Sequence, residues 1–239
     1  MSACLALLIT CEHGGNAVPP PYAPLFADWR DLLDSHRGFD LGALETARVL
    51  ARAAGAPLVA AATTRMLVDL NRSVGNSGLF SEVSKPLPRA QREAILREHY
   101  HPHREAVARI VADRLAAGRT VLHIASHSFT PRLGGVTRHC DVGFLYDPRR
   151  AAEKAFCLRW MRALAGFGGE LLLRRNYPYR GVADGLVTAF RRRFGEAYLG
   201  VELEVSQRFA RGGDEALASV SDSLAEALLD ALGREAAAC

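Results

Sequence analysis

Two histidines and a carboxylate, placed in three separate segments, could together hold a catalytic metal ion. His13 lies in the glycine turn TCEHGGN after an apolar run, and His127 follows the apolar segment TVLHIAS. Asp40 opens a helical pattern, with Glu45 one turn further on. Two histidines and one carboxylate, with the fourth position left for water, form a recurrent catalytic zinc arrangement. Aspartate at a helix start is also a common N-cap, so the acidic ligand stays open between Asp40, Glu45 and Glu12.

A pair of glutamates near the end of the chain stands out within an otherwise apolar strand. In GVELEVSQ, Glu202 and Glu204 share one strand face, and the other face carries Val201, Leu203 and Val205. Two carboxylates on one side of a core strand are costly unless they line a cleft or find partners. The pattern therefore predicts either a cleft or a structural ion pair at this position.

The segment TTRMLVDLNRS combines groups that bind carboxylates. Arg65 precedes a short apolar run, and Asn71 and Arg72 follow it. Arginine binds a carboxylate through two parallel hydrogen bonds, and a neighbouring asparagine can donate to the same group. The structural alternative is an ion pair of Asp69 with Arg65 or Arg72 that holds the loop. Arg180, in the glycine-rich loop NYPYRGVADG, is a further candidate for the same role.

Composition narrows the class of protein. The 239 residues are 49% hydrophobic and 23% charged, and the formal net charge of +4 is too small to indicate nucleic-acid binding. Arg191–Arg193 is the densest basic run, and we expect a solvated helix face there. The cysteines form no CxxC pair, which favours a reducing compartment. The first apolar run is too short to span a membrane, so we expect a cytoplasmic protein.

The order of apolar and helical patterns predicts the fold class. Apolar runs of strand length occur at residues 5–10, 57–61, 66–70, 119–125, 141–146, 170–174 and 199–205. Helical patterns occupy residues 40–54, 88–117, 150–166 and the stretch from Asp214 onward, and Pro102 should break or restart the second of them. Strands that alternate with helices predict one three-layer α/β/α domain over residues 1–239, with a mixed, largely parallel sheet. Residues 71–88 are a candidate substrate-facing or lid loop.

Several motifs in a fixed order carry a resemblance to a known family. They are Cys11-Glu12-His13 with Asn16 and Pro19, followed by DSHRGFDLGA, DLNRS, HSFTP, DVGFLYD, NYPYRG and ELEVSQRF. Together they span residues 11–209 and resemble the N-formylglutamate amidohydrolase family. DLNR is also similar to the Asn-Arg element of metallocarboxypeptidases and aspartoacylase. The resemblance implies a zinc-exopeptidase-like, phosphorylase/hydrolase-type sandwich and a cytoplasmic enzyme of amino-acid catabolism, such as histidine degradation.

The resemblance also implies roles for the candidate residues. His13 and His127 match metal-ligand positions, with Asp40 the best acidic third. Glu204 matches the general base, and Glu202 is the fallback. The remaining candidates would hold a substrate carboxylate: Arg65, Asn71, Arg72 and Arg180. The implied reaction is metal-dependent hydrolysis of the formyl amide of N-formylglutamate or a similar N-acyl amino acid.

Some features stay open at this stage. Zinc is the first choice of metal, although iron, cobalt or manganese suit the same ligands. Many relatives have a Pro-Tyr-His element where this chain has Tyr100-His101-Pro102-His103, so we expect His101 and His103 to lie on a helix surface. His36 has no assigned role. Alternative functions are hydrolysis of another N-acyl, N-formimidoyl or small-peptide amide, or a non-catalytic metal-binding module.

Overall fold

A six-stranded mixed sheet forms the centre of the protein, whose computed structural model describes residues 4–167 and 171–233. The spatial order of the strands is β2-β1-β3-β8-β6-β7. The first four strands are parallel, β6 is antiparallel to β8, and β7 is parallel to β6. The strands are β1 (Leu5–Cys11), β2 (Leu58–Ala60), β3 (Thr120–Phe129), β6 (Val142–Leu145), β7 (Leu173–Arg175) and β8 (Tyr198–Ser206). The prediction of a mixed, largely parallel sheet is confirmed.

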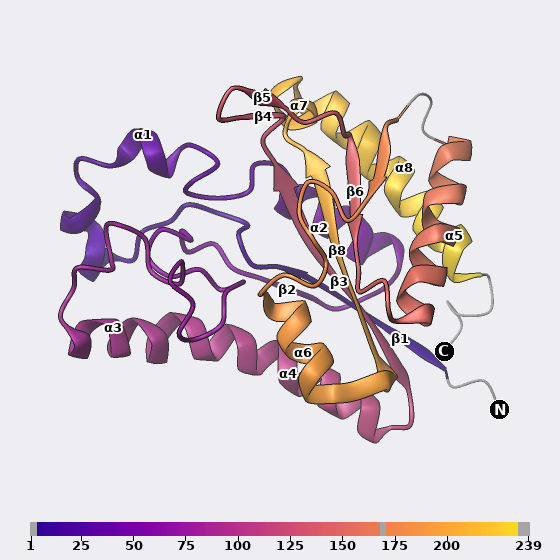
Figure 1. Cartoon of the computed structure of the whole chain (residues 1–239), viewed down its shortest axis with the longest axis horizontal. Coiled ribbons are helices and arrows are strands. Elements are labelled where there is room, and N and C mark those ends of the chain that lie inside the picture. The colour runs from indigo at the N-terminus through magenta and orange to yellow at the C-terminus, as the bar shows by residue number, and fades with distance from the viewer. Residues whose placement is uncertain (1–3, 168–170, 234–239) are drawn as a thin grey trace.

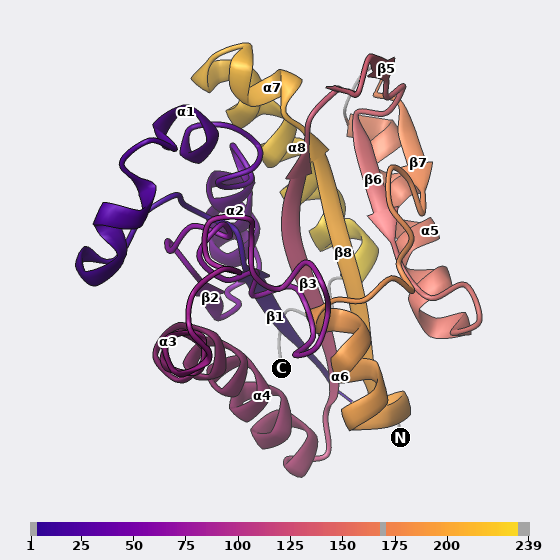
Figure 2. The same cartoon turned by 60° about the vertical axis from the view of Figure 1, so that its left-hand side comes forward.

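Helices cover both faces of this sheet (Figures 1 and 2). On one face lie α2 (Ala43–Ala53), α5 (Ala151–Phe167) and α8 (Asp214–Leu232), around a core that includes Phe144 and Trp160. On the other face lie α4 (His101–Ala116) and α6 (Leu186–Phe194), which pack on a smaller apolar cluster. The predicted three-layer sandwich is therefore confirmed.

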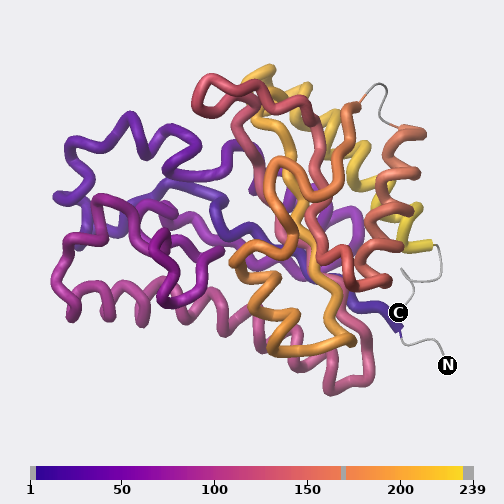
Figure 3. The backbone as a smooth tube through the Cα atoms, viewed as in Figure 1, coloured from indigo at the N-terminus to yellow at the C-terminus, as the bar shows by residue number. Residues whose placement is uncertain are grey.

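A second lobe of mostly irregular chain extends from the sandwich, at the left of Figure 3. It contains η1 (Pro20–Phe26), α1 (Arg30–Leu33) and α3 (Arg89–Ile95). The prediction of a strand at residues 66–70 is wrong. This run forms turns, and its apolar side chains are buried in the core of the lobe, so burial and not strand pairing explains the pattern.

Of the two alternatives predicted for Pro102, a break or a restart of the helix, the structure has the restart, because α4 begins one residue before it, without a gap in the helical segment. A π-helical turn, η2 (Leu96–Tyr100), precedes α4, and Pro102 is the second residue of α4, where its missing N–H matters least. The solvated-face prediction for residues 191–193 is wrong at Arg191. This side chain is buried and lies 2.9 Å from the carboxylate of Glu153.

The remaining elements are short. They are the hairpin β4 (Arg132–Leu133) and β5 (Val136–Thr137), η3 (Gly195–Ala197) and α7 (Arg208–Arg211). Of the predicted run 170–174, the first residue lies outside the described residues. Within the described part of the chain, none of the helices has the length and apolar character needed to cross a membrane.

Candidate active site

The candidate residues meet where the parallel strands end. β1 leads directly into Glu12 and His13, and β3 carries His127. His127 is paired in the sheet with Glu204 of β8, so two side chains far apart in the sequence are neighbours on one sheet face. Carboxyl ends of parallel strands meet at one edge of a sheet, and this is the usual position of a site in such folds.

The three predicted metal ligands come together. The Asp40 Oδ2 atom lies 3.3 Å from His13 Nδ1 and 2.9 Å from His127 Nδ1, and all three side chains are buried. Their possible ligand atoms lie within 4.8 Å of one another. The Asp40 amide donates to the His13 carbonyl, which holds the two segments side by side. Asp40 does not cap the next helix, because α2 begins at Ala43 after Gly42, and Glu45 is exposed on its first turn.

Each imidazole also faces a second carboxylate through its other nitrogen. His13 Nε2 lies 2.8 Å from Asp69 Oδ1, and His127 Nε2 lies 3.1 Å from Glu12 Oε2. In metal sites a ligating histidine almost always gives its second N–H to a carboxylate, a carbonyl or water, which sets the tautomer and the ring orientation. The second nitrogen of His13 is hydrogen-bonded to Asp69, and that of His127 lies at ion-pair distance from Glu12. The donor set of two imidazole nitrogens and one carboxylate fits a divalent cation.

The ionisable groups of this cluster shift one another's pKa values. Burial alone would raise the pKa of Asp40, but His13, His127 and Arg65 hold it well below its usual range. Burial would likewise lower the pKa of His127, yet its bonds to Asp40 and Glu12 raise that pKa well above the ordinary value. Burial would also raise the pKa of Glu12, but its contacts with His103 and His127 hold it well below its ordinary value. Asp40 and Glu12 thus stay ionised, and a metal ion that binds here must displace a proton from His127.

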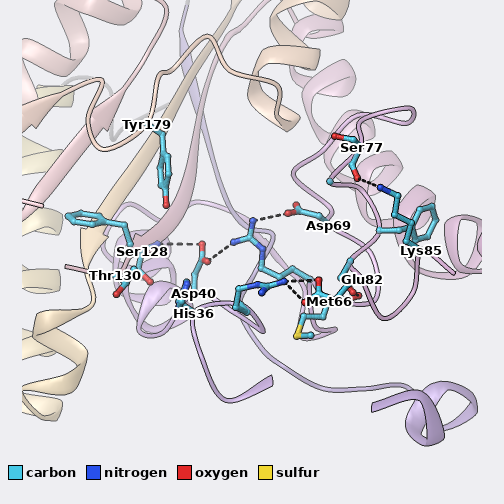
Figure 4. Close-up of a pocket in the computed structure, with 16 residues that line it drawn as sticks. His36, Asp40, Met66, Asp69, Ser77, Glu82, Lys85, Ser128, Thr130 and Tyr179 are labelled. Atoms are coloured by element: carbon cyan, nitrogen blue, oxygen red, sulfur yellow. Dashed lines mark hydrogen bonds and ion pairs between the residues drawn. The ribbon is translucent and has the colours of Figure 1, made fainter. Parts of the chain in front are cut away.

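Arg65 links Asp40 and Asp69, and dashed lines mark its ion pairs with these two labelled acids in Figure 4. Its guanidinium contacts Asp40 Oδ1 at 3.1 Å and Asp69 Oδ2 at 2.7 Å. Of the two ion pairs considered for Asp69, the one with Arg65 is present, and Arg72 is left for other contacts. Arg65 was predicted to bind substrate; the structure also gives it a structural role in the cluster.

Glu12 also lies close to a third histidine, His103. Its carboxylate is fully buried, and Oε1 lies 3.6 Å from His103 Nε2 on α4. Among the described residues neither atom completes a hydrogen bond, so the contact is an ion-pair approach. The surface prediction is therefore wrong for His103, whereas His101 is exposed as expected. His103 precedes the buried Val107 by four residues, a helical spacing that could have indicated its inward direction.

The two late glutamates face the metal-ligand cluster from β8. Glu204 is buried, and its Oε2 atom has no hydrogen-bond partner among the described residues. Burial, reinforced by the charges of Asp40 and Glu202 and opposed by His127, raises the pKa of Glu204 to about 8. The pKa of Glu202 is also raised, mainly by burial. The pattern thus indicates a cleft and not a structural ion pair.

The predicted carboxylate-binding residues line one cavity of about 160 Å³ together with both glutamates. Asn71 Oδ1 accepts from the Leu186 amide at 2.7 Å, and its amide nitrogen lies 3.3 Å from His127 Nε2. Arg72 donates to the Asp184 carbonyl at 2.7 Å, and Arg180 is exposed at the same cavity. Asp184, which the sequence reasoning missed, also accepts from Ser73 and Asn76 and thereby holds the loop.

A glycine makes this close packing possible. A side chain at Gly185 would begin 2.9 Å from Asn71 Oδ1 and 3.0 Å from Glu202 Oε1. The backbone between α6 and the preceding loop can approach both groups only because this position has no Cβ atom. The glycine-rich loop is therefore a wall of the cavity.

One protein family and several solved structures are similar to this chain. The family model for N-formylglutamate amidohydrolase matches residues 5–210. A gene product of Agrobacterium tumefaciens has a TM-score of 0.81 and 29% identity, over 97% of this chain and 92% of that one. An N-formylglutamate amidohydrolase from Ralstonia eutropha has a TM-score of 0.71 and 19% identity, over 95% and 93% of the two chains.

Two further comparisons complete the findings. A metallo-carboxypeptidase from Burkholderia cenocepacia aligns with 12% identity and a TM-score of 0.45. It covers 97% of this chain and 57% of that one, a similarity too low to support a functional argument. Among curated protein sequences none matches this chain significantly.

Proposed function

The chain belongs to the N-formylglutamate amidohydrolase family, and on this premise we propose that it is a metal-dependent amidohydrolase acting on an N-formyl amino acid such as N-formylglutamate. The products are formate and the free amino acid. One observation carries the proposal: the buried His13, Asp40 and His127 cluster faces Glu204, whose buried Oε2 atom has no hydrogen-bond partner in the described ranges 4–167 and 171–233. Both lie at the cavity that Asn71 and Arg72 line.

The metal would be held by His13, Asp40 and His127. Asp69 and Glu12 would orient the two imidazoles through their second nitrogens. A divalent cation, most simply zinc, supplies polarisation of the acyl carbonyl and increased acidity of water at neutral pH. Asp40 outranks Glu45 and Glu12 as the acidic ligand because Glu45 is exposed and Glu12 lies at the far nitrogen of His127.

Glu204 acts as the proton carrier in this scheme. It takes a proton from the attacking water, whose oxygen joins the acyl carbon, and passes that proton to the nitrogen as the C–N bond breaks. A catalytic group works best when its pKa lies near the working pH, and the pKa of about 8 meets that condition. Glu202, one pleat further along the same strand face, is the second candidate.

Asn71, Arg72 and Arg180 hold the carboxylate of the amino acid. Fixing the substrate at this end orients the amide against the cluster. This orientation lowers the entropic part of the activation barrier. Arg65 lies at the same cavity and presents its guanidinium beside Asp40, where it stabilises negative charge that develops on the acyl oxygen. The partner in this account is a small molecule, and the cytoplasmic location stays a prediction from cysteine usage.

A formate-release assay with N-formylglutamate tests the proposal. The wild-type protein should release formate, and Arg180→Met should raise KM by roughly 10- to 100-fold, the cost of a hydrogen bond to a charged group. Arg174→Met, at an exposed position on β7, is the matched control and should change nothing. Absence of formate release from N-formylglutamate and from other N-formyl amino acids would overturn the proposal.

A further inference from the structure

Arg180 depends on the backbone of its loop for its position. Its side chain lines the cavity of about 160 Å³ that holds the candidate carboxylate-binding residues. Among the described residues, no group forms a hydrogen bond or an ion pair with the Arg180 guanidinium. A long, exposed side chain without such contacts samples many rotamers, so the place from which its backbone starts decides what it can reach.

Asn176 begins this loop in a backbone conformation that few residue types adopt. It follows β7 directly, and its amide donates to the Phe144 carbonyl of β6 at 2.9 Å. Its φ is 50°, in the left-handed region, where asparagine is tolerated better than most residues other than glycine. The chain therefore turns away from the sheet at Asn176.

The side chain of Asn176 closes the loop on itself. Its Oδ1 atom accepts a hydrogen bond from the Gly181 amide at 3.0 Å and another from the Tyr146 amide, also at 3.0 Å. Because Tyr146 follows the last residue of β6, this one oxygen fixes both ends of the stretch 176–181 to the sheet. Arg180 lies inside the closed stretch.

Gly181, the far end of this stretch, is packed directly against the backbone of Tyr146. A Cβ atom at Gly181 would lie 2.2 Å from the Tyr146 nitrogen, so only glycine allows this approach. The Gly181 carbonyl also accepts a hydrogen bond from the Arg191 guanidinium, which is paired with the buried Glu153. The residue that follows Arg180 is thus held by two independent contacts.

The closed stretch faces the metal-ligand cluster. In Figure 4 the side chain of Tyr179 points toward Asp40. Arg180 follows Tyr179 and lines the same cavity as Asn71 and Arg72. A displacement of this stretch would therefore move Arg180 relative to the other two groups that hold the substrate carboxylate, and such misplacement weakens binding.

We propose that Asn176 is a positioning residue, which holds the stretch 176–181 on the end of β6 so that Arg180 reaches the substrate carboxylate. Asn176 is not among the described residues that line the cavity, so it acts through the backbone and not on the substrate. This role rests on the proposed function, in which Arg180 binds that carboxylate. Loss of the role should therefore raise KM and leave kcat close to the wild-type value.

Two substitutions at Asn176 separate its hydrogen bonds from its backbone conformation. Asn176→Gly removes the acceptor oxygen but adopts the left-handed conformation without strain, whereas Asn176→Asp keeps an acceptor oxygen at the same place. In the formate-release assay with metal-loaded protein and N-formylglutamate, Asn176→Gly should raise KM about tenfold, the size of two lost hydrogen bonds, with kcat unchanged. Asn176→Asp should keep KM near the wild-type value. Arg175→Met, at the exposed end of β7, is the matched control and should change neither constant.

A double-mutant cycle tests whether the effect passes through Arg180. In the Arg180→Met background, Asn176→Gly should raise KM by less than about twofold, because the contact that Asn176 positions is already absent. Full additivity of the two increases in KM would overturn the proposal, since Asn176 would then act by another route.

Gly181→Ala displaces the same stretch without removing the Asn176 oxygen, and it carries the test if Asn176→Gly fails to fold. The added Cβ atom would clash with Tyr146, so KM should again rise while kcat is kept. Wild-type KM in the folded variants, or a loss of kcat at unchanged KM, would overturn the positioning role and leave the proposed function standing. Absence of hydrolysis of every N-formyl amino acid by the wild-type protein would instead contradict the proposed function and, with it, this role.

Discussion

His123 and His127 lie on the same face of β3, four residues apart, yet their surroundings differ completely. His123 contacts the hydroxyl groups of Thr10 at 2.8 Å and Tyr198 at 2.6 Å, and burial lowers its pKa to about 4. His127 lies between the carboxylates of Asp40 and Glu12, and its pKa is raised. One is a neutral core histidine, and the other is a candidate ligand.

The difference teaches that the strand face does not decide the role of a histidine in this fold. Neutral hydroxyl partners satisfy both ring nitrogens of His123 and leave no group for a cation. Carboxylates around His127 supply the negative charge that a divalent ion needs. Position along the strand decides which partners are available, because only the carboxyl end of β3 reaches Asp40.

Removal of each histidine should give the largest contrast. His127→Gln should lower the affinity for zinc by at least about 100-fold. Loss of a residue that only orients a ligand costs about 10–100-fold, and this variant removes the ligand itself. Hydrolysis should fall with it. His123→Gln should keep the metal, although it disturbs a buried network and lowers thermal stability. Zinc affinities measured by chelator competition distinguish the two variants. Equal affinities would contradict the assignment of His127 as a metal ligand.

Substitution of Glu204 should lower turnover without changing the affinity for the metal. Glu204→Gln removes the proton carrier, so kcat should fall by about 10²–10⁴-fold while zinc affinity stays close to that of the wild type. Glu202→Gln is the matched variant on the same strand face and should have the smaller effect. Wild-type turnover in Glu204→Gln would remove it from the mechanism, and a larger loss in Glu202→Gln would transfer the role.

The pH dependence of stability should report the burial of Glu204. Its pKa is about 8 in the folded protein and near 4.5 when exposed, so its contribution to folding is complete below pH 4.5 and is lost as pH rises toward 8. In the metal-free protein, Glu204→Gln should remove this loss and gain on the order of 2–4 kcal/mol relative to the wild type at pH 8. Urea unfolding at pH 5 and pH 8 measures the free energy of unfolding of both proteins, with the exposed Glu45→Gln as the control. If Glu204→Gln loses as much stability between pH 5 and pH 8 as the wild type does, the raised pKa of Glu204 is contradicted.

The contact between Glu12 and His103, outside the three ligands, should matter least for metal binding. Glu12→Gln removes the charge that orients His127 and should weaken zinc binding by about 10–100-fold. His103→Gln should have less effect, because its approach to Glu12 is the longer one. His101→Gln, exposed on the same helix, should match the wild type. Zinc affinities measured by chelator competition test all three, and no change in Glu12→Gln would rule out this positioning role.

Much of the fold followed from apolar periodicity, and the site followed from polar residues at strand ends. That His13, Asp40 and His127 lie together could be anticipated in part, because His13 directly follows β1 and His127 lies near the end of β3, whereas Asp40 lies in the irregular segment before α2. Their role as metal ligands stays a prediction. The run 66–70 misled because an apolar stretch packs equally well in an irregular lobe, and periodicity does not distinguish the two. His103 was missed because its role depends on how α4 packs against Glu12, which no local pattern specifies.

A cavity of about 510 Å³ beside the site was beyond prediction for a related reason. Its wall combines the segment around Arg37, the loop that carries Lys85 and the end of β3, which meet only in the folded chain. Residues that share a cavity need no common spacing. The sequence could indicate the loop 71–88 as substrate-facing, but it could not indicate that this loop lines a cavity of that volume.

The central claim is that one cation binds between His13, Asp40 and His127, and anomalous X-ray diffraction from zinc-loaded crystals tests it most directly. The account predicts a single strong zinc peak within bonding distance of both imidazoles and the Asp40 carboxylate, on the side that faces Glu204. A peak at another set of residues, or no peak at these three under zinc-saturating conditions, would contradict it.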